Sequence, residues 1–240
     1  MSGLLEATDL RSGYGRADDT VRGISLALAP GSITAVIGPN GSGKSSFIKT
    51  LAGLLPARAG RIRLAGQDLT TLSPARRCLA GIAYVPQEGN VFRGMTVREN
   101  LALATEFLRG RAGVGPEREG TVLAMFPDLG QAGAKLAGNL SGGQRQMLAF
   151  ACALLAAPDM LLLDEPSAGL SPRFVAEVMA TVQRVRKLGI TVLLVEQNVR
   201  AALGIADRVV VLVGGRLVAE GPPAEIAAAD LGALFLSRVA

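Results

Sequence analysis

The chain has 240 residues, of which 49% are hydrophobic and 19% are charged. This balance is typical of a folded globular protein and excludes a disordered chain. Its formal net charge is +5, but the arginines are scattered and only 4% of the residues are aromatic. Because base-stacking surfaces need clustered basic and aromatic side chains, we expect no nucleic-acid partner.

Three further observations predict a cytoplasmic protein. The longest apolar stretch, 147–157, is shorter than the roughly 18 residues that span a bilayer. The first residues lack the basic and apolar regions of a secretory signal. The two cysteines, Cys78 and Cys152, stand in unrelated contexts and form no metal motif, which favours a reducing compartment.

The first third of the chain predicts strands joined by tight turns, including an antiparallel side sheet near the N-terminus. Ser73 and Pro74 together predict the start of a short helix, because serine caps a helix and proline suits its first position. The predicted strands cover 24–28, 33–37, 61–65 and 82–85.

Residues 96–157 predict a mainly helical region. Thr96 and Glu99 have the spacing of a capping box, and 144–157 carries apolar residues at helical intervals. The stretch 109–120 is rich in glycine and arginine, which predicts an exposed loop in which Pro116 can open the next helix.

The last third alternates apolar strands with helices, which predicts an α/β fold with a mainly parallel sheet covered on both faces. A hairpin is predicted over 209–220, around Gly214 and Gly215. The other predicted elements are strands at 160–163 and 191–195 and helices at 172–188 and 199–205.

Residues 38–45 read GPNGSGKS, which fits the phosphate-binding P-loop pattern without departure. The string follows an apolar strand and opens a helix, so its backbone amides can cradle phosphates. Lys44 is expected to reach the β- and γ-phosphates of ATP, and Ser45 to ligate Mg²⁺. The predicted nucleotide-binding residues here are Gly38, Pro39, Asn40, Gly41, Ser42, Gly43, Lys44, Ser45 and Ser46.

Residues 160–165 read MLLLDE, an apolar strand that ends in two carboxylates and is similar to the Walker B pattern. Asp164 is expected to bind the Mg²⁺ ion through a water molecule. Glu165 is placed to orient the attacking water and to accept its proton. Many α/β strands end in aspartate, so this pattern alone is a weak signal. It indicates a nucleotide site because a P-loop precedes it in the same chain.

Residues 140–146 read LSGGQRQ and match the signature sequence of the ABC family, which the chain resembles over residues 4 to about 235. The resemblance implies a RecA-like P-loop NTPase fold with an N-terminal antiparallel β subdomain. It also implies one domain over 1–240, with a helical subdomain inserted at about 88–157. In the family the signature contacts ATP held by a partner subunit, which implies nucleotide binding in trans by Ser141, Gly142, Gly143 and Gln144.

The resemblance implies three more site residues. Tyr14 is similar to the aromatic residue that stacks on adenine, because its ring offers the base a flat apolar face. Gln87 resembles the Q-loop glutamine, which touches Mg²⁺ and senses the membrane partner. Gln197 occupies the switch position near the γ-phosphate. The resemblance thus implies that Glu165, Gln87, Gln197 and Lys44 take part in hydrolysis.

Two positions depart from the family pattern. The D-loop, 167–171, ends in Ser171 where the family has aspartate, and the switch residue is Gln197 where the family has histidine. The chain has no histidine at all, so catalysis that needs an imidazolium is excluded. Glu165 and Lys44 are both present, and we therefore expect an active site.

The strings VEQN at 195–198, DEPSAGLSP at 164–172 and the stretch 90–101 resemble the smaller ATP-binding subunit of branched-chain amino acid importers. That resemblance implies two membrane permeases, a periplasmic binding protein and a second ATP-binding subunit, in a heterodimer or a homodimer. It places the chain at the cytoplasmic face of the inner or plasma membrane as a peripheral subunit. The open alternatives are an importer of urea or amides and a soluble ABC ATPase, for example of iron–sulfur assembly.

Overall fold

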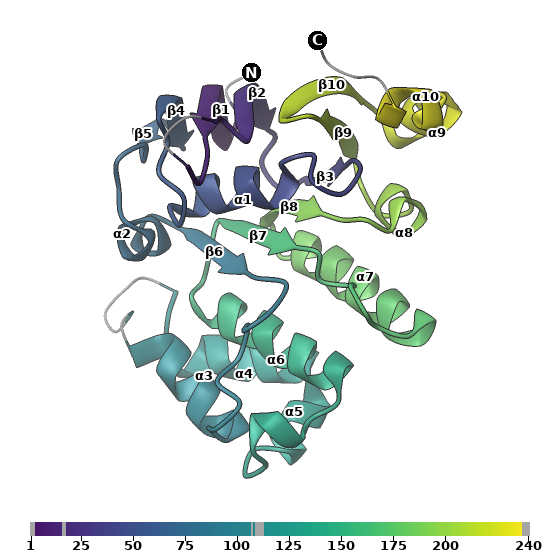
Figure 1. Ribbon diagram of the computed structural model, residues 1–240. Coiled ribbons are helices and arrows are strands. Elements are labelled where there is room, and N and C mark those ends of the chain that lie inside the picture. The colour runs from purple at the N-terminus through teal and green to yellow at the C-terminus, as the bar shows by residue number, and fades with distance from the viewer. Residues whose placement is uncertain (1–2, 16–17, 107, 109–112, 237–240) are drawn as a thin grey trace.

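The computed structural model describes residues 3–15, 18–106, 108 and 113–236. Its centre is a six-stranded sheet in the order β10-β9-β3-β8-β7-β6, in which only β10 runs antiparallel to its neighbour (Figure 1). The strands are β3 (Ile33–Ile37), β6 (Ile82–Val85), β7 (Met160–Asp164), β8 (Thr191–Val195), β9 (Arg208–Val213) and β10 (Arg216–Gly221).

The central strands β3, β7 and β8 are buried along their whole length. Parallel strands that are covered on both faces read as continuous apolar runs, which explains why the sequence predicts them well. Their carboxyl ends lie at one edge of the sheet, and the segments that follow them carry most of the predicted site residues.

A smaller antiparallel sheet in the order β2-β1-β4-β5 packs beside the central one (Figure 1). The helix α1 (Lys44–Ala52) lies between the sheets and buries Phe47, Ile48 and Leu51 in a core that both sheets share. The strands of the smaller sheet are β1 (Leu5–Ser12), β2 (Val21–Leu28), β4 (Ala59–Leu64) and β5 (Gln67–Asp68).

A group of helices packs beneath the central sheet in Figure 1, and its apolar residues around Phe126 and Phe150 belong to one core that is shared with the sheet. These helices are α3 (Val97–Glu106), α4 (Pro116–Met125), α5 (Pro127–Gln131), a short 3₁₀ turn (Ala137–Asn139) and α6 (Gly142–Leu155). The remaining helices are α2 (Pro74–Leu79), α7 (Pro172–Lys187), α8 (Val199–Leu203), α9 (Pro223–Ala228) and α10 (Leu231–Leu236).

The helix caps that the sequence predicts are present. Ser73 accepts the N–H of Arg76 at the start of α2, and Thr96 and Glu99 exchange hydrogen bonds at the start of α3. None of the helices in the described part of the chain is both long and apolar enough to cross a membrane.

Two predictions of local structure need correction. The predicted loop at 109–120 ends earlier than predicted: Pro116 opens α4, as the sequence predicts, and residues 116–120 are helical, with an acidic first turn that suits a helix N-terminus; residues 109–112 lie outside the described part. Strand β1 was not predicted, because a register shift around Asp9, whose φ is 45°, interrupts the alternation of its side chains.

Candidate active site

The predicted P-loop, 38–46, joins the end of β3 to the start of α1. Its backbone needs glycine: Gly41 and Gly43 have φ values of 76° and 96°. A Cβ atom at Gly38 would lie 2.1 Å from the carbonyl oxygen of Leu212, and one at Gly43 would lie 2.8 Å from that of Thr20. A side chain at position 38 or 43 would therefore clash with the backbone of a neighbouring segment.

Lys44 lies inside this loop and is only 4% exposed. Its Nζ atom donates to the carbonyl oxygens of Gly38 at 2.9 Å and Pro39 at 3.0 Å. Burial lowers the pKa of Lys44, and the carboxylates of Glu165 and Asp164 act in the opposite direction. The buried hydroxyl of Ser42 has no hydrogen-bond partner. The loop thus combines a buried ammonium group, a hydroxyl without a hydrogen-bond partner and a glycine-rich backbone. These are the features expected of an anion-binding loop.

Asp164 is the last residue of β7, and its carboxylate accepts hydrogen bonds from two hydroxyl groups. The Ser45 hydroxyl donates to its Oδ1 atom at 2.9 Å, and the Tyr84 hydroxyl donates to its Oδ2 atom at 3.1 Å. Burial raises the pKa of Tyr84, and Asp164 raises it further, so the phenol stays protonated as a donor. The hydroxyl and carboxylate oxygens of Ser45 and Asp164 are the hard donors that Mg²⁺ prefers, so these residues fit that ion.

The sequence did not single out Tyr84, although its contact with Asp164 makes it part of the site. The two residues are 80 positions apart, and they meet because β6 pairs with β7. The only available signal was that Tyr84 stands in the predicted strand that leads to Gln87.

Glu165 follows directly after β7 and is 6% exposed. Its φ of 49° is unusual for a residue with a long side chain. The Gln197 amide donates through Nε2 to Glu165 Oε2 at 2.6 Å. The residue at the switch position thus meets the predicted base directly, through a neutral amide.

A cavity of roughly 250 Å³ brings these groups together at the carboxyl edge of the sheet. It is lined by Thr20, Asn40, Gly41, Ser42, Gly43, Lys44, Ser45, Ser46, Gln87, Glu165 and Gln197. Three residues that lie far apart in the sequence, Gln87, Glu165 and Gln197, therefore line the same cavity as the P-loop. Tyr14 does not line the cavity, and its side chain is 68% exposed.

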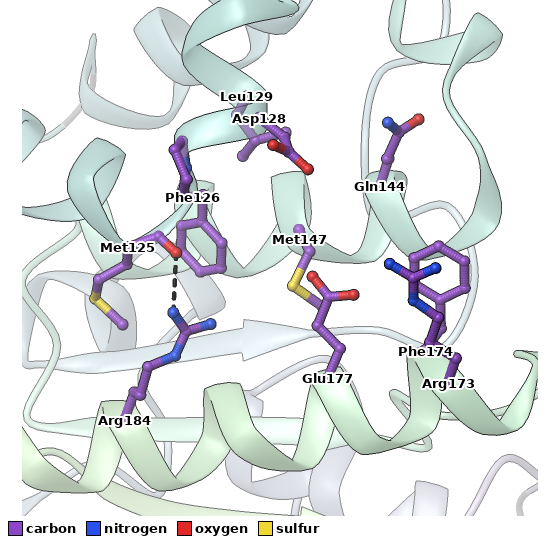
Figure 2. Close-up of a pocket in the computed structure, with 11 residues that line it drawn as sticks. Met125, Phe126, Asp128, Leu129, Gln144, Met147, Arg173, Phe174, Glu177 and Arg184 are labelled. Atoms are coloured by element: carbon purple, nitrogen blue, oxygen red, sulfur yellow. Dashed lines mark hydrogen bonds between the residues drawn. The ribbon is translucent and has the colours of Figure 1, made fainter.

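The predicted signature residues 141–144 lie elsewhere, at the start of α6. Ser141 and Gln144 form a reciprocal capping box there, so α6 begins at Gly142, two residues before the predicted start. A second cavity of roughly 290 Å³ opens between this end of α6, α5 and α7. Figure 2 shows Gln144 on one side of this cavity and Phe174 of α7 beneath it.

Comparisons with known proteins agree with this geometry. The family model described as "ABC transporter" matches residues 21–168. A solved structure titled as a nucleotide-free ATP-binding cassette from an ABC transporter is 27% identical, with a TM-score of 0.85 over 98% of this chain and 99% of that one. An ADP conformation of another cassette is 28% identical, with a TM-score of 0.83 over 98% and 95% of the two chains. The predicted P-loop NTPase fold is confirmed.

Two kinds of curated relative are similar over most of the chain. "Probable branched-chain amino acid transport ATP-binding protein LivF" of Archaeoglobus fulgidus is 41% identical over 93% of this chain and 94% of its own length. BraG of Pseudomonas aeruginosa, a high-affinity branched-chain amino acid transport ATP-binding protein, is 40% identical over 85% and 87% of the two chains. LptB of Acidithiobacillus ferridurans, a lipopolysaccharide export system ATP-binding protein, is 36% identical over 94% and 93%.

The family model covers more than half of the chain, and the curated relatives described as ATP-binding proteins are 36% to 41% identical over most of it. The chain belongs to the ABC transporter family and is an ATP-binding, ATP-hydrolysing subunit of a transporter.

Proposed function

We propose that this subunit drives the import of branched-chain amino acids. The observation that carries this proposal is the similarity to LivF and BraG at 41% and 40% identity over most of the chain. Export is the second candidate, because the LptB relatives are 36% to 32% identical over similar lengths. The string VEQN at 195–198, which resembles the branched-chain subfamily, favours import.

Each site residue has a proposed role in hydrolysis. The P-loop amides and Lys44 bind the phosphates of ATP, and the ring of Tyr14 stacks on the adenine. A bound Mg²⁺ would neutralise charge on the phosphates, held by Ser45 and Gln87 directly and by Asp164 through water. The unpartnered hydroxyl of Ser42 gains an acceptor when a phosphate oxygen enters the loop.

Glu165 orients a water molecule for attack on the γ-phosphate and accepts its proton. Gln197 donates to this carboxylate at 2.6 Å, which fixes the carboxylate's orientation while no proton leaves the amide. Because an amide carries no charge near neutral pH, the switch position contributes hydrogen bonding without a titrating group.

Two ATP-binding subunits enclose each nucleotide in this proposal. Residues 141–144 lie outside the P-loop cavity of their own chain, so they are free to contact ATP on a partner. The partner is a second, related subunit or another copy of this chain. Closure moves two membrane permeases that dock near Gln87, and a periplasmic binding protein delivers the substrate. The subunit is then peripheral, at the cytoplasmic face of the membrane, with residues 1–240 as one domain and 88–157 as its helical subdomain.

The direction and substrate can be tested with the assembled transporter in lipid vesicles. The subunit is purified with the membrane proteins that it captures, and ATP hydrolysis is measured with the matching binding protein. We expect leucine, isoleucine or valine on the binding protein to stimulate hydrolysis several-fold and to enter the vesicles. Stimulation by urea or amides alone would support that alternative importer. Capture of lipopolysaccharide-export proteins, or of no membrane protein, would contradict import.

A further inference from the structure

Glu196 is a buried carboxylate that the proposed mechanism does not use. It follows β8 directly and is 1% exposed. Within the part of the chain that the structure describes, no ion pair includes it. Burying an unpaired charge is costly unless hydrogen bonds compensate, so the contacts of this side chain indicate what it does.

The two oxygen atoms of Glu196 hold two different segments of the site. Oε1 accepts the backbone N–H of Ser167 at 3.0 Å, and this bond is buried. Oε2 accepts the backbone N–H of Asn198 at 3.4 Å. Ser167 belongs to the D-loop, 167–171, which follows Glu165, whereas Asn198 adjoins Gln197. One side chain therefore bridges the segment after β7 and the segment after β8.

The backbone of Glu196 is anchored as firmly as its side chain. Its N–H donates to the carbonyl oxygen of Val36 at 3.1 Å, in the strand that leads into the P-loop. Beside it, the N–H of Glu165 donates to the carbonyl oxygen of Val195 at 2.9 Å. Glu196 thus lies where the ends of β3, β7 and β8 meet, next in sequence to Gln197, whose side chain contacts Glu165 at 2.6 Å.

The electrostatics of this position are unfavourable. Burial raises the pKa of Glu196 and the charge of Glu165 raises it further, while the two N–H donors lower it. A methionine or leucine at the end of this apolar strand would avoid the cost of burying a carboxylate. Neither side chain could accept hydrogen bonds from two backbone N–H groups.

We propose that Glu196 is a positioning residue that ties the D-loop to the switch segment, so that Glu165 and Gln197 meet in the geometry that hydrolysis requires. It does not touch the nucleotide and takes no part in proton transfer. The inference rests on the proposed role of Glu165 as the base. It predicts that changes at Glu196 lower the rate of hydrolysis and leave the affinity for ATP intact.

The test compares Glu196→Ala and Glu196→Gln with the unchanged full-length chain. Alanine leaves two N–H groups without acceptors, and we expect kcat to fall by about tenfold or more while KM for ATP stays within about twofold. Glutamine keeps an acceptor for Ser167 but turns its NH₂ group toward the N–H of Asn198, so we expect an intermediate kcat. This isosteric variant also remains informative if the alanine variant folds poorly.

Thr191→Val is the matched control, at the other end of the same strand. Thr191 is fully buried, and its hydroxyl oxygen accepts the backbone N–H of Gly31 at 2.8 Å. This variant also loses a buried acceptor and should lower Tm, but we expect kcat to stay within about twofold, because residue 191 is far from the catalytic edge.

Hydrogen exchange provides a readout that does not need turnover. In Glu196→Ala we expect the amides of Ser167 and Asn198 to exchange about tenfold faster or more, with little change in Thr191→Val. Unchanged exchange, or a kcat within twofold of the original, would overturn the inference. Equal loss of kcat in the control would also overturn it. If Glu165→Gln retains turnover, the proposed base is wrong; if Glu165→Gln is inactive but Glu196→Ala is not, only the positioning role fails.

Discussion

At the scale of single residues, the site is defined by polar contacts that form between neighbouring strand ends. Lys44, Ser45, Asp164 and Glu165 are readable from short strings, because each stands in a motif whose spacing implies its chemistry. The contacts of Tyr84 with Asp164 and of Glu196 with Ser167 are not readable in that way. They depend on which strands become neighbours, and no local pattern encodes strand order.

The hydrogen bond from the Tyr84 hydroxyl should help to orient the Asp164 carboxylate for Mg²⁺. Tyr84→Phe removes a donor to Oδ2 and leaves Oδ1 with the Ser45 hydroxyl. We expect the Mg²⁺ concentration for half-maximal hydrolysis to rise a few-fold and stability to fall by about 1 kcal/mol, the usual value of one hydrogen bond. A Mg²⁺ titration at saturating ATP measures the first effect and urea unfolding the second. An unchanged Mg²⁺ requirement would mean that Tyr84 only packs beside the site.

At the scale of elements, the apolar strands and the capped helices could be predicted, because burial on both faces and cap residues leave strong local patterns. Strand β1 escaped prediction because its bulge at Asp9 breaks the alternation of its side chains. The apolar spacing predicts the start of α6 two residues late, because two glycines favour a loop and only the capping box of Ser141 and Gln144 shows that they are helical.

The contact between α6 and α7 predicts which glycine of the signature is required. A Cβ atom at Gly143 would lie 2.1 Å from the ring of Phe174, whereas one at Gly142 would lie 3.4 Å from Leu170. We expect Gly143→Ala to lower the free energy of unfolding by about 1–3 kcal/mol through overpacking, and Gly142→Ala to be tolerated. Urea unfolding measures both variants.

A double variant separates this contact from other causes. Adding Phe174→Ala to Gly143→Ala removes the ring that the new methyl group meets. We expect it to recover most of the lost stability relative to Phe174→Ala alone, which a double-mutant cycle detects. Equal losses with and without Phe174 would show that the backbone of α6, and not this ring, requires glycine.

At the scale of the whole molecule, the chain presents two half-sites on separate surfaces. The P-loop cavity gathers Lys44, Glu165 and Gln197, while residues 141–144 lie at the start of α6 outside it. In the proposed function, such a chain completes a nucleotide site by pairing with a second ATP-binding subunit. On this proposal, ATP binding drives closure of the pair because ATP stabilises the closed pair more than the open one.

The most direct test is the mass of the Glu165→Gln variant in solution, with and without Mg-ATP. We expect this variant to retain bound ATP, to lose nearly all turnover, and to double in mass with ATP, either alone or when mixed with the ATP-binding subunit that it captures from membranes. Adding a bulky charge by Gly142→Glu, at the signature glycine where a side chain has room, should abolish the doubling while the P-loop still binds ATP. A variant that binds ATP at full occupancy yet keeps the mass of one chain, both alone and with that subunit, would contradict the account.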